Sequence, residues 1–227
     1  MRREVLQRLL DAWREKRPVV LATDHASGVQ QLIGAADAAG AALADAARDA
    51  LARDACVTHE GAGGAIFLQP FNPPLRMIIV GAVHIAQPLA SMAALAEYDV
   101  AIVDPRAAFA TAARFPGVTL TTEWPDQALR ALAPDARTAI VTLTHDPKLD
   151  DPALRVALRS PAFYVGALGS KKTHGARVAR LREEGFTDAE IARIHAPVGL
   201  DIAARSPAEI AISILAEITQ LLRGASR

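Results

Sequence analysis

The stretch from Met77 to Ala86 reads MIIVGAVHIA, a buried strand that enters a turn at Gly81 and continues into a helix. Free N–H groups and the helix dipole at such a helix start favour a phosphate. Only Gly81 fits the pattern G-x-G-x-x-G, because Val83 and Ala86 occupy the second and third glycine places. Ala86 suits helix packing but Val83 hinders the approach of a pyrophosphate, so a phosphate-binding turn and a plain strand–helix turn both remain open.

The order of apolar strand and helical segment repeats after this turn. We expect strands at residues 76–81, 100–104, 118–121, 138–142 and 162–166, and helices at 84–96, 107–115, 126–132, 151–158 and 171–184. Two later helices begin with capping boxes, at Thr187 and at Ser206. This alternation is typical of a parallel sheet covered on both faces, so we predict a Rossmann-like α/β fold.

Residues 1–72 have a different pattern and are predicted to form a small α+β domain. Helices are expected at 1–16 and 35–53, and hairpin turns at 25–28 and 61–64. The segment 70–74, PFNPP, is incompatible with a helix and predicts a stiff connector. We therefore place the boundary between residues 1–72 and a Rossmann-like domain of residues 73–227.

The composition argues against several classes of partner. The 227 residues include 25 Lys plus Arg and 25 Asp plus Glu, so no net electrostatic field attracts a nucleic acid or an anionic membrane. Cys56 is the only cysteine, which excludes an internal disulfide and a cysteine-based metal site, and suits a reducing compartment. We expect a cytoplasmic protein without a signal peptide or a membrane-spanning segment.

Polar side chains follow two of the predicted strands, at the edge where open α/β sheets bind ligands. Asp104 ends the second strand of the domain, where an acidic side chain commonly binds ribose hydroxyls. Arg106 follows it and could bind a phosphate or simply pair with Asp104. Thr144, His145 and Asp146 follow the fourth strand, either as ligand-binding groups or as a polar turn with a solvated histidine.

A second glycine turn follows the fifth predicted strand and contains Gly166, Gly169, Ser170 and Lys171. Ser170 is expected to cap the following helix, and this helix start could bind a second anion. Because Lys171 and Lys172 point in different directions on a helix, only one of them is expected to face a ligand.

Asp201 lies in a non-helical stretch, PVGLDI at residues 197–202, among apolar neighbours. A carboxylate in apolar surroundings usually needs a specific partner. Arg205 is one candidate partner, in a structural ion pair, and a ligand contact is the other interpretation.

Five short strings occur in order along the second domain. They are VGAVH at 80–84, DPR at 104–106, THDP at 144–147, YVGALGSKK at 164–172 and PVGLDI at 197–202. Together they resemble the C-terminal Rossmann-like domain of the XdhC/CoxI family of xanthine dehydrogenase accessory proteins. The resemblance implies a chaperone role, in which members bind molybdenum cofactor, assist its sulfuration and pass it to an apo-enzyme.

Two features depart from the pattern of that family. The family's glycine turn has a glycine before the histidine, whereas Val83 precedes His84 here. The family's N-terminal domain carries a Gly-Gly-Cys-x-Glu motif, whereas residues 34–40 read GAADAAG and Cys56 lies elsewhere. Residues 1–72 therefore resemble a reduced N-terminal domain, and a separate short chain of the family could supply the missing thiolate.

The resulting prediction is a homodimeric accessory protein that holds molybdopterin, or its dinucleotide form, at the carboxyl edge of the sheet. Its expected partners are a molybdenum hydroxylase of the xanthine dehydrogenase or CO dehydrogenase type and a sulfur transferase. An NAD(P)-dependent oxidoreductase, disfavoured by Val83, and a docking module with a vestigial pocket are the alternatives. The candidate cofactor-binding residues are Gly81, His84, Asp104, Arg106, Thr144, His145, Asp146, Gly166, Gly169, Ser170, Lys171 and Asp201.

Overall fold

The chain forms two compact units, residues 1–73 and residues 74–227. A computed structural model describes residues 2–34, 41–61 and 64–224. Each unit has its own sheet and its own hydrophobic core.

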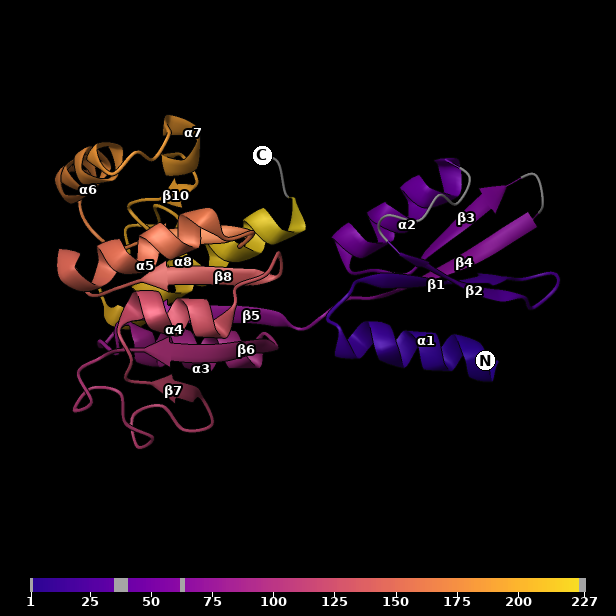
Figure 1. Ribbon diagram of the computed structural model, residues 1–227, viewed down its shortest axis with the longest axis horizontal. Helices are drawn as coiled ribbons and strands as arrows, with labels where there is room; N and C mark the ends of the chain where they lie inside the picture. Colours follow the sequence, from indigo (N-terminus) through magenta and orange to yellow (C-terminus); the bar gives the residue numbers. More distant parts are fainter. Residues whose placement is uncertain (1, 35–40, 62–63, 225–227) are drawn as a thin grey trace. The chain divides into compact units, whose positions relative to one another are not determined.

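The smaller unit is a four-stranded antiparallel sheet with strand order β2-β1-β4-β3. Its elements are α1 (Arg3–Arg14), β1 (Val19–Asp24), β2 (Gln30–Gly34), α2 (Ala41–Arg53), β3 (Val57–Gly61) and β4 (Gly64–Phe71). Alternate residues of β1 face opposite sides, so Val19 and Leu21 pack with α1, whereas Val20 and Ala22 pack with α2. The two helices therefore cover opposite faces of the sheet (Figure 1).

The turn between β1 and β2 lies where a hairpin is predicted. Asp24 accepts hydrogen bonds from the N–H groups of Ala26 and Ser27 and from the Ser27 hydroxyl, at 2.9, 2.7 and 2.9 Å. An aspartate that binds the backbone two and three residues ahead is typical of such a turn. Residues 35–40 of the helix expected at 35–53 and residues 62–63 of the turn expected at 61–64 lie outside the described residues.

The segment 70–74 differs from the prediction, because Pro70 and Phe71 belong to β4 rather than to a connector. Pro70 lies opposite Val20 of β1, and the register of β4 with β3 ends at Leu68. A proline is tolerated at this position because one side of the strand is no longer paired.

The larger unit is a six-stranded parallel sheet with strand order β10-β9-β8-β5-β6-β7. Its elements are β5 (Leu75–Val80), α3 (Ala86–Leu95), β6 (Tyr98–Val103), β7 (Thr119–Thr121), α4 (Pro125–Leu132), β8 (Thr138–Thr142), α5 (Pro147–Arg159), β9 (Tyr164–Ala167), α6 (Lys171–Glu183), α7 (Asp188–Ile191), β10 (Ile194–His195) and α8 (Pro207–Arg223). This is the order 3-2-1-4-5-6 of a doubly wound sheet, which confirms the predicted fold class.

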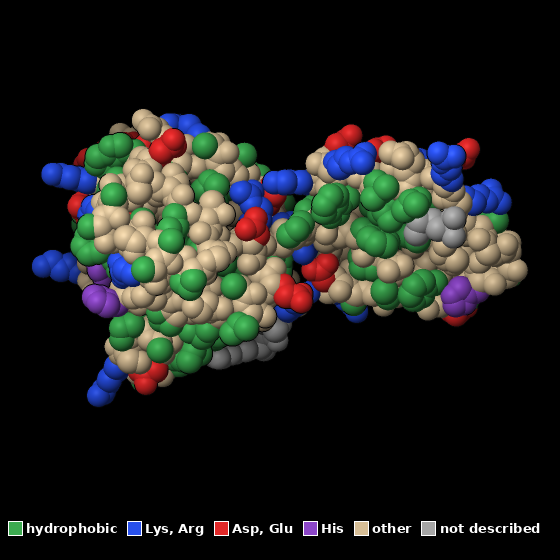
Figure 2. All heavy atoms as spheres, turned by 90° about the horizontal axis from the view of Figure 1, so that it is seen from below, with side chains coloured by type: hydrophobic (Ala, Val, Ile, Leu, Met, Phe, Trp, Pro, Cys, Tyr) green, Lys and Arg blue, Asp and Glu red, His purple; other side chains and the backbone are tan. Residues whose placement is uncertain are grey.

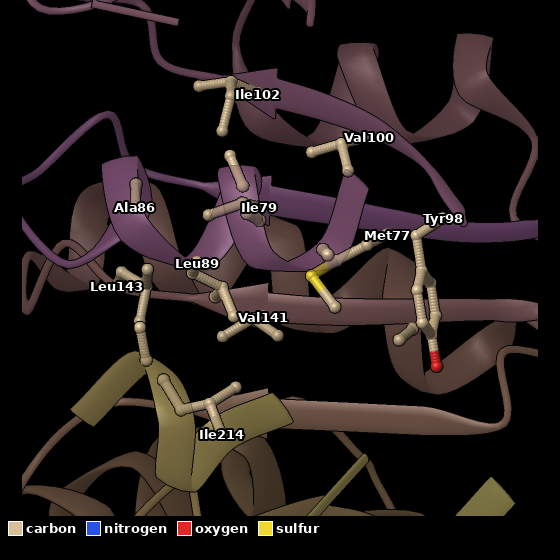
Figure 3. Packing of buried hydrophobic residues seen from close by; sticks show 14 of the residues in the cluster. Met77, Ile79, Ala86, Leu89, Tyr98, Val100, Ile102, Val141, Leu143 and Ile214 are labelled. Atoms are coloured by element: carbon tan, nitrogen blue, oxygen red, sulfur yellow. The ribbon is translucent and has the colours of Figure 1, made fainter. Parts of the chain in front are cut away.

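Helices cover both faces of this sheet, as its almost wholly apolar strands require. Met77, Ile79 and Val141 face the side covered by α3 and α8, where they pack with Leu89 and Ile214 (Figure 3). The other face packs against α4, α5, α6 and α7. With both faces covered, the strand ends are the part of the sheet left for a ligand.

One local prediction for this unit was wrong, and one short strand was not predicted. Residues 107–115 form successive turns instead of a helix, and Phe115 alone of this segment is fully buried. The two-residue strand β10 was not expected, because two residues show no periodicity. Among the described residues, no helix is long and apolar enough to span a membrane.

Candidate functional site

The sheet order reverses between β5 and β8, and ligands of open α/β sheets bind outside the strand ends at this position. In Figure 1 the arrows of β6 and β8 end at the left side of the larger unit, which marks the carboxyl edge. Gly81 and Thr144 follow β5 and β8, and a Cβ atom on Gly81 would lie 2.6 Å from the Thr144 methyl group. With φ of +108° as well, this position requires glycine.

Asp104 is completely buried beside the Gly81 turn and makes four internal hydrogen bonds. Its Oδ2 accepts the Ala82 N–H at 2.8 Å and Arg106 Nη2 at 2.7 Å. Its Oδ1 accepts the Arg106 N–H at 3.0 Å and Arg106 Nε at 2.9 Å. The structure thus favours the ion-pair interpretation of Asp104, since in this state neither oxygen is free to bind a ribose.

The electrostatics of this pair follow from the same contacts. Burial acts to raise the pKa of Asp104, but the hydrogen bonds from Arg106 and Ala82 outweigh it and hold that pKa below its ordinary value. The Arg106 guanidinium lies 4.6 Å from the ring centroid of Phe109 and is partly exposed. The Arg106 guanidinium is thus the positive charge beside the first turn. The side chain of His84 is also exposed there.

The loop after β8 contains an ordered polar turn and one exposed histidine. Asp146 caps α5 by accepting the Lys148 N–H at 2.9 Å, and its own N–H donates to the Thr144 hydroxyl at 3.1 Å. His145 lies between them with a φ of +60° and an exposed side chain. This geometry matches the polar-turn interpretation for Thr144 and Asp146, and leaves His145 available to a ligand.

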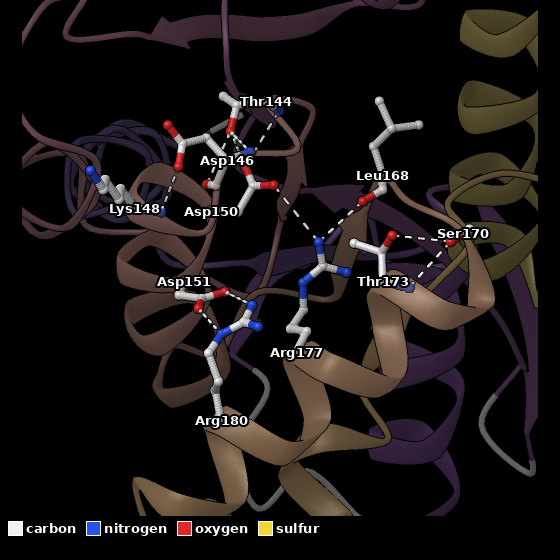
Figure 4. Close-up of polar contacts among 10 residues, drawn as sticks. All are labelled: Thr144, Asp146, Lys148, Asp150, Asp151, Leu168, Ser170, Thr173, Arg177 and Arg180. Carbon is white, nitrogen blue, oxygen red and sulfur yellow. Dashed lines mark hydrogen bonds and ion pairs between the residues drawn. The ribbon is translucent and has the colours of Figure 1, made fainter.

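Two buried residues under this edge, Asp150 and Arg177, did not emerge from the sequence (Figure 4). Thr144 donates its hydroxyl to Asp150 Oδ1 at 2.6 Å. Arg177 Nη2 lies 3.7 Å from Asp150 Oδ2 and donates to the Leu168 carbonyl at 3.1 Å. The pair therefore links the loops after β8 and β9. Only packing in three dimensions brings these residues together, so a sequence pattern could not reveal them.

This second pair is poorly satisfied. Arg177 Nε and Nη1 and Asp150 Oδ2 are buried without a hydrogen-bond partner in the described structure. Burial raises the pKa of Asp150 and lowers the pKa of Arg177. His174 Nδ1 is likewise buried and unpartnered, and burial followed by the charge of Arg177 lowers the pKa of His174.

The second glycine turn is shaped by packing at one end and by a helix cap at the other. A Cβ atom at Gly166 would lie 2.6 Å from Val198 and 2.7 Å from the Tyr164 ring, so the missing side chain admits these two groups. Ser170 accepts the Thr173 N–H at 3.2 Å, which confirms the predicted cap of α6. Gly169 precedes this cap with a φ of +140°.

A cavity of about 440 Å³ lies beside this turn, between the start of α6 and the loop before α8. Lys171 and Asp201 both line it, whereas Lys172 does not. The prediction for Asp201 was wrong in one respect, because its side chain is exposed rather than enclosed. No described residue, Arg205 included, forms an ion pair or hydrogen bond with the Asp201 carboxylate.

A partly buried glutamate holds the loop that carries Asp201. Glu217 of α8 accepts the Gly199 N–H at 2.9 Å and the Tyr164 hydroxyl, and it pairs with His195 Nδ1 at 3.2 Å. The rings of His195 and Tyr164 stack with centroids 4.6 Å apart. Sequence reasoning missed Glu217 because it lies in an apolar helix far along the chain.

The other side chains that could carry chemistry are histidines, basic residues and Cys56. Figure 2 shows histidine and basic side chains at the left end of the larger unit. In the part of the chain that the structure describes, no three or more His, Cys, Asp or Glu side chains form a possible metal site. Cys56 is an exposed free thiol in the smaller unit.

Comparison with known proteins assigns the larger unit to a family. A family model for the XdhC Rossmann domain matches residues 77–218. The chain is 35% identical over 151 residues to the molybdenum cofactor insertion chaperone PaoD of Escherichia coli, covering 66% of this chain and 41% of PaoD. It is 33% identical over 156 residues to a probable xanthine dehydrogenase subunit of Bacillus subtilis, covering 68% of this chain and 45% of that protein.

A solved structure shows the same fold over nearly the whole chain. It is described as a xanthine dehydrogenase from Bacillus halodurans, with a TM-score of 0.70 and 23% identity, and the match covers 99% of this chain and 66% of that one. The chain spans less than half the length of the curated relatives it matches.

Proposed function

The chain belongs to the family of the XdhC Rossmann domain, and on that premise we propose that it binds molybdenum cofactor and assists its insertion into a molybdenum hydroxylase. The name of the relative PaoD, a molybdenum cofactor insertion chaperone, supports this role. Hydroxylases of the xanthine dehydrogenase or CO dehydrogenase type are the proposed recipients.

The observation that carries the proposal is the distribution of unpaired polar groups on the carboxyl edge. His84, His145, Lys171 and Asp201 are exposed there, and none has a hydrogen-bond or ion-pair partner among the described residues. His84, His145 and Asp201 lie on the loops after β5, β8 and β10, and Lys171 begins α6 after β9. Such a row of free groups on loops held by a rigid sheet suits an extended polar ligand.

The phosphate of a bound molybdopterin would meet the start of α6. This helix presents free N–H groups, and its first turn is fixed by the Ser170 cap. In the dinucleotide form of the cofactor, the additional nucleotide would extend along the edge toward Arg106 and His84. The protein residues bind and orient the cargo, and the cofactor itself brings the molybdenum.

The turn at Gly81 argues against an NAD(P)-dependent oxidoreductase. Gly81 donates its N–H to the Val103 carbonyl at 2.8 Å, and the Ala82 N–H is bound to Asp104. Val83 packs against the hydrophobic core. The first two N–H groups of the turn and the acidic side chain of a dinucleotide site are therefore already engaged.

The test is to identify the small molecule that the protein binds. We expect mass spectrometry of the purified protein to show a molybdopterin species, and calorimetry to show binding of molybdopterin cytosine dinucleotide. His145→Ala is expected to weaken that binding, with Lys148→Ala in the first turn of α5 as the matched control. No pterin in the purified protein and no heat of binding with folded protein would refute the proposal, and quenching of NADPH fluorescence would favour the oxidoreductase instead.

The proposed partners are tested separately from the ligand. We propose that the protein acts in the cytoplasm as a homodimer, with residues 1–72 as a reduced family N-terminal domain that docks the hydroxylase or a sulfur transferase. Cys56 does not lie at the position of the family's Gly-Gly-Cys-x-Glu motif. A separate short chain of the family would supply the thiolate of that motif. Light scattering and co-purification with the hydroxylase test these assignments. Partner binding without any small ligand, with maturation unaffected by His145→Ala, would support the docking-module alternative.

A further inference from the structure

The cavity beside α6 contains two unpaired charges of opposite sign. Lys171 lies at the first position of α6, and Asp201 lies on the loop between β10 and α8. Although both line the same cavity, no ion pair forms between them, and neither has another partner among the described residues. Leu168, Pro197 and Ile210 contribute apolar surface to the lining.

The loop that carries Asp201 is held in place by α8. A Cβ atom at Gly199 would lie 2.4 Å from the Ser213 hydroxyl, so the loop backbone packs directly on the helix. The Leu200 N–H donates to the Ser213 carbonyl at 3.1 Å, and the Gly199 N–H donates to Glu217. The backbone next to Asp201 is therefore held in a defined position, which limits where its carboxylate can lie.

We propose that this cavity binds the 2-amino-4-oxopyrimidine edge of a fused, planar heterocycle. The edge presents an amino group and a ring N–H side by side, which suits the two oxygens of Asp201, and beside them a carbonyl oxygen, which suits the Lys171 ammonium. A neutral ring would use both charges while its faces contact the apolar lining. This inference rests on the proposed function, since the edge is shared by pterins and guanine nucleotides.

A zwitterion such as a free amino acid could also pair with both charges. The lining favours the ring, because an α-amino acid carries its two charged groups on one carbon and would leave most of the apolar surface uncovered. Calorimetry with leucine is therefore included in the experiment, and tight leucine binding would overturn the proposal.

The experiment compares ligands that differ by single groups. The probes are 6-carboxypterin, followed by its own fluorescence, and GMP and IMP, followed by calorimetry. IMP lacks only the 2-amino group of GMP, so we expect GMP to bind about tenfold more tightly. Tighter binding of the pterin than of GMP would identify a pterin as the source of the edge, and the reverse would identify a guanine nucleotide.

Variants of the two charged residues test the assigned roles. Asp201→Asn is expected to weaken 6-carboxypterin binding by about 10- to 100-fold and to abolish the preference for GMP over IMP. Lys171→Met is expected to weaken binding by about tenfold. The matched controls are Lys172→Met, next to the cavity but not lining it, and Asp99→Asn, an exposed carboxylate on β6. Both controls should bind as the wild type does.

The outcomes separate this inference from the proposed function. Equal binding of GMP and IMP, no binding of either ring, or Asp201→Asn within twofold of the wild type would overturn the ring site. If molybdenum cofactor still co-purifies in that case, the chaperone role stands without this site. All four positions are exposed, so circular dichroism is expected to show the wild-type fold for each variant.

Discussion

The two glycine turns of the larger unit are each supported by an aspartate–arginine pair, but the two pairs differ in how well they are satisfied. At the first turn, Asp104 accepts four hydrogen bonds, and one of them consumes the N–H of Ala82. At the second, Arg177 holds the Leu168 carbonyl while two of its nitrogens lack acceptors. The better-satisfied turn is therefore the one with less capacity to bind a ligand.

This difference shows that a glycine turn at a strand end does not by itself indicate a phosphate site. At Gly81 the polar groups expected to bind a ligand instead bind one another. Beside Gly169 the supporting arginine is buried beneath the turn, and Lys171 is an exposed cation that lines the neighbouring cavity. Substitutions that alter each support should therefore distinguish the two turns.

The largest effect is expected from Arg177→Met. Removing the guanidinium leaves Asp150 as a buried carboxylate without a counter-charge, and the free energy of unfolding should fall by about 3–5 kcal/mol. The matched control is Arg182→Met on the same helix, whose ion pair with Asp188 is exposed and should contribute less than about 1 kcal/mol. Urea denaturation measures both. A loss below that of the control would show that the Asp150 pair does not stabilise the second turn.

Asp104→Ala is expected to lower the free energy of unfolding by about 3 kcal/mol, because the Ala82 N–H and Arg106 lose their shared partner. Asp201→Ala removes a carboxylate without a partner and should change stability by less than about 0.5 kcal/mol. Equal effects of the two substitutions would contradict the distinction between a closed and an open turn.

The same pair predicts a dependence on pH. Because the folded-state pKa of Asp104 lies below the ordinary value of 3.8, its charged form stabilises the fold at neutral pH. The stability difference between the wild type and Asp104→Asn should therefore be complete above about pH 5 and should shrink as the pH falls below 3.8. A difference that stays constant down to about pH 2.5 would contradict the role of the charge.

Gly81→Ala is expected to cost about 2–3 kcal/mol, since the new Cβ atom meets Thr144 at a backbone angle unfavourable for alanine. Gly175→Ala in α6 is the control of opposite sign, because no atom lies within 4 Å of the new Cβ and the helix should gain about 0.5–1 kcal/mol. Thermal unfolding of both variants measures the contrast.

A smaller loss of stability is expected at the cap of α6. Ser170→Ala removes the acceptor of the Thr173 N–H and should cost about 1 kcal/mol, whereas Ser170→Gly should cost only a few tenths. If the alanine variant is as stable as the glycine variant, the cap contributes little to the second turn.

The parts of the fold that follow from local chemistry could be predicted from the sequence. The strand predicted at 138–142 has the observed bounds, and both capping boxes, at Thr187 and Ser206, form as expected. These features depend on apolar runs and on contacts three residues apart, which a sequence displays directly. The helix predicted at 107–115 was wrong because the alanines of this segment favour a helix. In the structure the Arg106 guanidinium contacts the Phe109 ring and Arg114 donates to the Phe109 carbonyl, so the segment forms a compact set of turns.

The candidate site was harder to predict because its decisive contacts join distant segments. Asp104 was found in the sequence, but its partner Ala82 lies on another strand end, and that contact changes the interpretation of both residues. Arg177 and Asp150 belong to different helices. The burial of Asp201 was overestimated because its apolar neighbour Ile202 is itself 52% exposed.

The attachment of the loop at Gly199 and Leu200 to α8 has a thermodynamic consequence for any ligand of the neighbouring cavity. Ordering a residue of free backbone costs about 1–2 kcal/mol of conformational entropy. Here the hydrogen bonds to Glu217 and Ser213 order these residues when the chain folds. Association therefore proceeds without that entropy loss at the anchored residues, so more of the contact energy is expressed as affinity.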